Sequence, residues 1–166
     1  MNDSAWLQRM AFVKRLPWLV LACAFAVPHA LADSTAGRYI LPIEHSPLLT
    51  GVCSRGVPRS IDGYWLPAAA DIDALEQDLP GYLAHTLDIK GHGESYSLTQ
   101  FRRQYIGFIS HGRRFIYGNF YPSSLSYSDS ERAALKDICD GGPLFWGVVY
   151  SVDNREFSQL AFNGIG

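Results

Sequence analysis

The stretch at residues 101–120 constrains the fold more than any other part of the chain. It holds two runs rich in aromatic and β-branched side chains, which predict two strands joined by a tight turn at His111 and Gly112. This turn sets the expected cross-strand pairs: Phe108 with Phe115, Gly107 with Ile116, Ile106 with Tyr117, and Tyr105 with Gly118. Both faces of the hairpin then carry large apolar side chains. One face is expected to meet a helix, and the other needs a cover from the N-terminal arm, another chain or a ligand.

The remaining elements predict an α+β fold in which a helix packs on a four-stranded antiparallel meander. Apolar residues recur at steps of three and four from Ile72 to Leu87. Pro80 interrupts this helix, and one kinked helix is favoured over two because the apolar phase continues across it. A short helix is expected over 131–137, and strands over 144–150 and 157–162. This order is similar to that of cystatin-like rolls, a topological similarity that carries no function.

The first 32 residues are typical of a secretory signal peptide. Basic residues precede an apolar run from Leu16 to Val27, and Ala30-Leu31-Ala32 follows as a small-residue cleavage site. The run is about 12 residues long, too short for a membrane span, so we expect a periplasmic or secreted protein with no membrane span. A lipoprotein modified at Cys23 is the alternative interpretation, but little apolar sequence precedes that cysteine.

Removal of the leader from the 166-residue chain leaves 166 − 32 = 134 residues, enough for one domain with a core. The leader holds three basic residues and one acidic residue, so the mature chain has 14 − 3 = 11 basic and 16 − 1 = 15 acidic residues. This acidic balance argues against a nucleic-acid partner. Residues 33–63 are broken by prolines and glycines and are expected to form an extended, loosely structured arm, with the α+β domain over 64–166.

Two cysteines remain in the mature chain, Cys53 and Cys139. In an oxidising compartment they allow one intramolecular disulfide, which would attach the arm to the domain. A reactive thiol is the alternative, but no Cys-x-x-Cys motif supports it.

A set of short motifs resembles small secreted bacterial proteins that lack an assigned activity. The motifs are Arg103-Gln-Tyr-x-Gly, Ile116-Tyr-x-Asn, Cys139-Asp-Gly-Gly, Phe145-Trp-Gly-Val-x-Tyr150 and Phe162-Asn-Gly164. The resemblance covers roughly residues 64–164. It implies export and a single domain, and it supplies no catalytic residues.

Catalytic, metal and cofactor motifs are weak in this sequence. His85, His92 and His111, with Glu94, lack the spacing of a metal site, so neither a metal nor a cofactor is expected. No Gly-x-Ser-x-Gly elbow is present, and no catalytic residue is assigned.

The candidate binding residues lie mainly on the central hairpin. Four arginines there could hold a carboxylate or phosphate of a partner, or could cap strand edges and pair with acidic residues of the helix. Asp140 and Asn163, each followed by glycine, could form a ligand rim or simple turns. The full set is Arg102, Arg103, Arg113, Arg114, Tyr105, Asp140 and Asn163.

These features favour an exported, non-catalytic protein that binds another protein, as an inhibitor or an immunity factor. One alternative is a small periplasmic hydrolase acting on envelope polymers, which needs His92, Glu94, His111 and Asp140 in one cleft. Another is a carrier of a small apolar ligand between sheet and helix.

Overall fold

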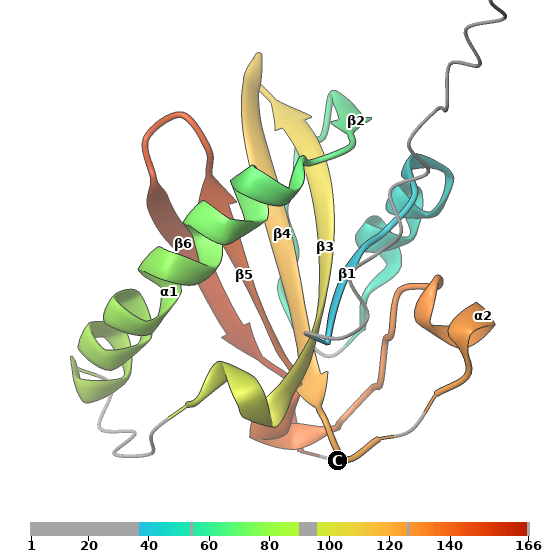
Figure 1. Cartoon of the computed structure of the whole chain (residues 1–166), viewed down its shortest axis with the longest axis vertical. Coiled ribbons are helices and arrows are strands. Elements are labelled where there is room, and N and C mark those ends of the chain that lie inside the picture. The colour runs from blue at the N-terminus through green and yellow to red at the C-terminus, as the bar shows by residue number, and fades with distance from the viewer. Residues whose placement is uncertain (1–36, 54, 90–95, 126, 166) are drawn as a thin grey trace, which may run out of the picture. The chain divides into compact units, whose positions relative to one another are not determined.

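A mixed sheet forms the centre of the protein, in a computed structural model that describes residues 37–53, 55–89, 96–125 and 127–165 (Figure 1). All of these residues belong to the unit Leu31–Gly166. The strands within the described ranges are β1 (Arg38–Ile40), β2 (Gly63–Trp65), β3 (Phe101–Ser110), β4 (Arg113–Pro122), β5 (Trp146–Ser151) and β6 (Glu156–Phe162). The helices there are α1 (Ala69–Ile89) and the short α2 (Asp129–Arg132), with 3-10 turns η2 (Ile43–Gly51), η3 (Leu98–Gln100) and η4 (Gly142–Leu144). The expected leader lies outside the described residues.

The predicted α+β class is confirmed, but the sheet has more than the four expected strands. Strands β3 to β6 form the antiparallel meander, and β1 and β2 both add to the free edge of β3. β1 pairs in parallel and β2 in antiparallel orientation, so the sheet is mixed and has six strands. A three-residue strand is too short to show an alternating pattern, so neither was recognisable in the sequence.

The register of the central hairpin is as predicted. Tyr105 pairs with Gly118 and Gly107 with Ile116. The turn residues His111 and Gly112 have φ angles of 49° and 71°, both in the left-handed region that a two-residue type I′ turn requires. A side chain at position 107 would collide with the backbone and ring of Trp65, which explains why a glycine stands there.

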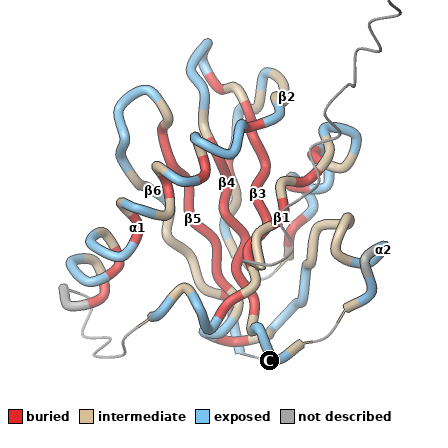
Figure 2. Tube along the Cα trace, viewed as in Figure 1, coloured by how far each residue is buried: buried red, intermediate tan, exposed pale blue. Residues whose placement is uncertain are grey.

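One face of the sheet is covered by α1, which crosses it diagonally in Figure 1. The helix is a single element with Pro80 inside it, so the alternative of two separate helices is wrong. Its apolar side is fully buried against Tyr105, Ile116, Phe120 and Trp146 of the sheet. Burial is concentrated in the central strands, as Figure 2 shows. The helix residues of this core are Ile72, Leu75, Leu79, Leu83 and Leu87.

The opposite face is covered by the N-terminal arm, one of the three covers that the sequence allowed. Leu41, Leu49 and Val52 are buried against Ile106, Phe108 and Tyr117 of the sheet. The arm is therefore more ordered than its prolines and glycines indicated, because β1 and η2 hold it on the sheet.

Two element boundaries differ from expectation because other contacts use their backbone groups. The helix expected over 131–137 ends at Arg132. Beyond it, Gln104 donates to the carbonyl of Ala134, and Asn119 donates to that of Lys136, so this segment lies on sheet side chains instead of coiling. The strand expected from 144 begins at Trp146, since η4 occupies the preceding turn.

Candidate functional site

The four arginines of the central hairpin divide into two pairs at opposite ends. Arg102 and Arg103 lie near the start of β3, whereas Arg113 and Arg114 lie beside the turn. Arg103 and Arg114 share a face, as expected, but they stand six residue pairs apart, roughly 20 Å along the strands. They cannot hold one small anion together.

Arg103 and Tyr105 belong to a buried ionic cluster under α1. Glu76 is its centre: its carboxylate lies 3.3 Å from Arg103 Nε and 2.9 Å from Arg38 Nε, and it accepts a 2.6 Å hydrogen bond from the Tyr105 hydroxyl. Burial, with the nearby Glu76 charge, raises the pKa of Tyr105 well above its ordinary value. This cluster joins β1, β3 and α1, and it places both residues inside the protein.

The segments that hold Asp140 and Asn163 lie side by side, mainly through backbone hydrogen bonds between residues 142–145 and 163–164. The backbone N–H of Gly142 donates to Gly164 at 2.9 Å. Asn163 is 5% exposed and donates to the carbonyl of Ile138. Asp140 is exposed in the turn, with a φ of 58°. The turn interpretation therefore accounts for the contacts of Asn163.

A polar network around Arg55 was missing from the sequence-based set. Arg55 Nε donates to the Tyr117 hydroxyl at 2.9 Å, and its Nη atoms donate to Asn119 and Asn163. Gly147 leaves the space that the Tyr117 hydroxyl occupies. Sequence patterns did not indicate a role for Arg55, because an isolated arginine in an irregular arm has no periodicity. Its one distinguishing feature is its position two residues after Cys53.

The predicted disulfide is confirmed and lies close to this network. Cys53 and Cys139 are joined with their Cα atoms 5.4 Å apart. Asp137 accepts a 2.9 Å hydrogen bond from the backbone N–H of Cys53. The arm is thus attached to the segment after α2 by a covalent bond and by polar contacts.

The hairpin tip carries the most exposed group of aromatic and arginine side chains among the candidate residues. The Arg114 guanidinium lies 5.0 Å from the Trp65 ring centre, and that of Arg113 lies 5.6 Å from the ring centre of Phe115. Leu66, next to Trp65, is 50% exposed. We call Trp65, Leu66 and Arg114 the tip surface. Tyr64 and Phe115 pack on the opposite, arm-covered face of the sheet, where Arg113 lies over Phe115.

Bonds from the β2 segment hold the tip surface rigid. Asp62 donates its backbone N–H to Ile109 and accepts a 2.6 Å bond from the His111 N–H on its carboxylate. The Trp65 indole N–H donates to the carbonyls of Phe108 and Phe115, both at 3.2 Å. The indole N–H of Trp65 is therefore satisfied by hydrogen bonds within the protein. The half-buried Trp65 ring is held in place, and Arg114 packs against it.

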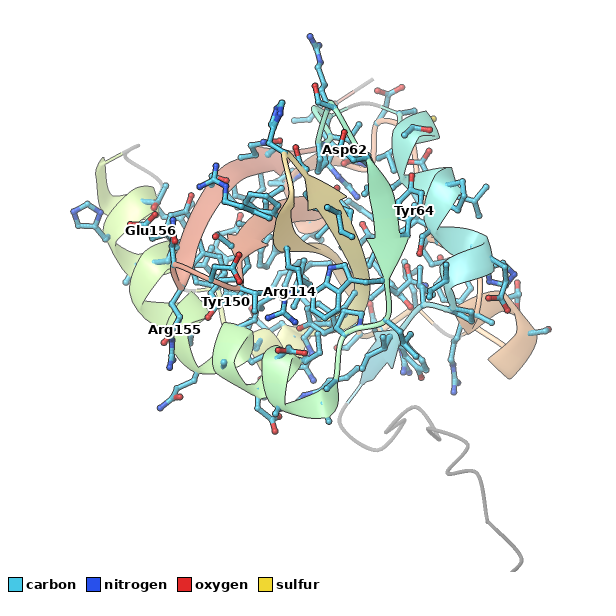
Figure 3. The ribbon with its side chains drawn as sticks, turned by 90° about the horizontal axis from the view of Figure 1, so that it is seen from above. Asp62, Tyr64, Arg114, Tyr150, Arg155 and Glu156 are labelled. Carbon is cyan, nitrogen blue, oxygen red and sulfur yellow. A yellow bond between two sulfur atoms is a disulfide. The ribbon has the colours of Figure 1, made fainter. Side chains whose placement is uncertain are left out.

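Charged groups surround the tip surface on the α1 side. Seen from above, Arg114 lies between Tyr64 on the β2 side and Tyr150 and Arg155 on the α1 side (Figure 3). Arg155 bonds both carboxylate oxygens of Asp78 at 3.0 and 2.9 Å. Hydrogen bonding from Arg155, opposed in part by desolvation, lowers the pKa of Asp78. Arg114 lies only loosely against Asp153, at 3.8 Å, so its donors remain accessible.

The histidines and acidic residues considered for catalysis do not form a visible site. Within the described residues, no group of three histidine, cysteine, aspartate or glutamate side chains could hold a metal ion. His111 lies at the hairpin turn, whereas Asp140 lies just before the turn at the far end of β4, so one cleft does not hold both. His92 and Glu94 fall outside the described ranges.

Comparisons with protein-family models, curated proteins and solved structures find no match to this chain. A search of the described residues for a helix with the length and hydropathy of a membrane span finds none. The disulfide agrees with an extracellular or periplasmic protein.

Proposed function

We propose that this chain is an exported, non-catalytic binding protein that engages another protein through the tip surface, as an inhibitor or an immunity factor. The observation that carries the proposal is the contact of Arg114 with Trp65 beside a half-exposed leucine. Tryptophan, tyrosine and arginine supply most of the binding energy in protein interfaces. The apolar-ligand carrier stays a prediction from the sequence, and so does a hydrolase, although not one that uses His111 and Asp140 in a shared cleft.

Rigidity of the tip supports the same proposal. A binding surface that is ordered before association loses less conformational entropy when the partner arrives. The hairpin register, the turn and the bonds from Asp62 hold Trp65 and Arg114 in place in the free protein. Arg114 would meet a carboxylate of the partner, with Trp65 and Leu66 filling apolar pockets.

Two leucines of similar exposure provide a matched test. Leu66 is 50% exposed at the tip surface, and Leu144 is 53% exposed in η4 at the other end of the sheet. Proteins captured from an envelope extract by the wild-type chain would be compared with those captured by Leu66→Ala, Arg114→Ala and Leu144→Ala. We expect the first two variants to lose the partner and Leu144→Ala to retain it.

The affinity of each variant for the purified partner then measures how much binding free energy is lost with each side chain. Truncation of a central interface residue costs more than about 1 kcal/mol, so Arg114→Ala should bind roughly fivefold more weakly or worse. Equal binding by Leu66→Ala, Arg114→Ala and wild type would remove the tip surface from the proposal. Failure to capture any protein in repeated extractions would contradict the binding function itself.

A further inference from the structure

Two tyrosine hydroxyl groups are buried on the arm face without a hydrogen-bond partner among the described residues. They belong to Tyr39 in β1 and Tyr121 in β4, which are 7% and 0% exposed. Buried phenol hydroxyls almost always find a partner, because an unpaired polar group in the interior is costly. These two hydroxyls therefore mark a position where a hydrogen-bonding group belongs.

The sheet register places both tyrosines beside Arg102. Tyr121 is the direct cross-strand partner of Arg102, and Tyr39 pairs with Gln104, two residues further along β3. Alternation along the strands puts all these side chains on the same face. Burial, and then the neighbouring Tyr39, raises the pKa of Tyr121 to about 12, with Arg102 and Arg132 acting in the opposite direction. Tyr39, Arg102 and Arg132 are thus within electrostatic reach of Tyr121.

Residues that follow β4 add a second guanidinium and an aromatic ring next to this position. Arg132, at the end of α2, lies 5.8 Å from the ring centre of Tyr39. The ring of Tyr127 meets that of Tyr121 edge-on at 5.7 Å, and Lys136 lies 4.2 Å from the Tyr127 ring centre. We call Tyr39, Tyr121, Arg102 and Arg132 the tyrosine–arginine cluster.

The chemistry of the tyrosine–arginine cluster selects the kind of ligand. Arginine offers only donors, and a phenol hydroxyl is a good donor. Carbonyls of the segment that follows β4 are used by other groups: that of Leu125 accepts from Arg102, and those of Arg132 and Ala134 accept from Gln104. An acceptor can take a hydrogen bond from each of the two hydroxyls, and the nearby positive charges favour a negatively charged one.

We propose that the tyrosine–arginine cluster binds a small oxyanion, a carboxylate or a phosphate, which accepts hydrogen bonds from both tyrosine hydroxyls. The site lies beside Tyr127 and Arg132, at the other end of the hairpin from the tip surface. It is therefore independent of the proposed protein-binding function. Bound anion would stabilise the folded chain, because the unfolded chain has no such cluster.

Denaturant unfolding in titrations of sodium acetate, sodium phosphate and sodium chloride tests this site. The wild-type protein and Tyr64→Phe, a matched loss of one hydroxyl at the tip, should show a saturable rise in the unfolding midpoint with one of the oxyanions. At about one hundred times the dissociation constant, linkage raises the folding equilibrium constant about 100-fold. Tyr39→Phe and Tyr121→Phe should lose this response. The salt that saturates at the lower concentration distinguishes carboxylate from phosphate.

Each other outcome overturns the proposal. A flat response of wild type in all three salts means that the hydroxyls do not meet an anion. An equal response of wild type, Tyr39→Phe and Tyr121→Phe means a general salt effect, or an adventitious ion only. Titration calorimetry of the folded variants with acetate and phosphate separates lost binding from lost stability, because Tyr→Phe removes only the hydroxyl group.

Discussion

The two faces of the sheet are covered in different ways. On one face, α1 supplies a continuous row of buried leucines, with the Glu76 cluster at its edge. On the other, short segments of the arm and the region after α2 are held by a disulfide and by the Arg55 network. A long amphipathic helix buries enough apolar surface to stay in place, whereas short irregular segments need cross-links and specific polar bonds.

Loss of the disulfide should give the largest effect and should separate the two faces. The double variant Cys53→Ser, Cys139→Ser opens a loop with a sequence separation of 86, which should lower the free energy of unfolding by about 4 to 5 kcal/mol. Hydrogen exchange should become faster in β1 and η2 while α1 keeps more of its protection. Wild type and variant should unfold alike in reductant. Equal loss of protection on both faces would show that they unfold as one unit.

Neutralising Glu76 should be the most damaging single change on the helix face. The side chain is 9% exposed, and Glu76→Gln leaves the Arg103 guanidinium, 8% exposed, without its carboxylate. Breaking a buried pair in this way costs about 3 kcal/mol or more. Asp73→Asn is the control, because Asp73 bonds the same Arg38 but is 62% exposed. Equal midpoints of the two variants in urea unfolding would contradict a buried role for Glu76.

Removal of the Arg55 guanidinium should weaken the arm face by a smaller amount. Arg55→Met keeps most of the side-chain length but leaves Asn119 and Asn163 without that donor. Unsatisfied buried acceptors cost about 1 to 3 kcal/mol. The exposed Arg59 of the same arm is the control, and Arg59→Met should leave the urea midpoint unchanged. A midpoint for Arg55→Met that matches this control would mean that the disulfide alone holds the arm.

The Asp78–Arg155 pair at the edge of the helix face should have the smallest effect and a defined pH dependence. The pKa of Asp78 is lowered from 3.8 in the folded protein, so the pair stabilises fully above that value and is lost as the pH falls through the folded-state pKa. The Asp78 side chain is 28% exposed, which keeps the contribution below about 1 kcal/mol. Asp78→Asn should therefore be slightly less stable than wild type at neutral pH and equal to it in strong acid. A difference that grows on acidification would contradict this assignment.

Local patterns were sufficient for the central hairpin and the main helix. Tight-turn chemistry at His111 and Gly112 determines the register, and apolar spacing marks α1. The arm was harder to predict, because β1 and β2 are three-residue strands that form only where the edge of β3 offers partners. The short α2 was overestimated for a related reason: sheet side chains such as Gln104 compete for the carbonyls that a longer helix would use.

The candidate site was predictable only in part. Sequence reasoning named Arg113 and Arg114 but grouped them with Arg102 and Arg103, which serve contacts at the other end of the hairpin. Trp65 was noted among the aromatic residues, yet its place beneath Arg114 depends on β2 pairing with β3. Arg55 was missed because its partners come from β4 and from the residue that follows β6, both far from it in the sequence.

The amino-acid sequence by itself determined the α+β class, the hairpin register and, on the expectation that the leader with Cys23 is removed, the one possible disulfide. The fold class and the register follow from turn chemistry and periodicity, which are local properties of the sequence. The disulfide follows from the number of cysteines, which leaves a single possible pair. Tertiary structure decided which segment covers each sheet face and which arginines remain exposed. Alternation along a strand creates two faces that both need burial, but the pattern does not encode which distant segment supplies it.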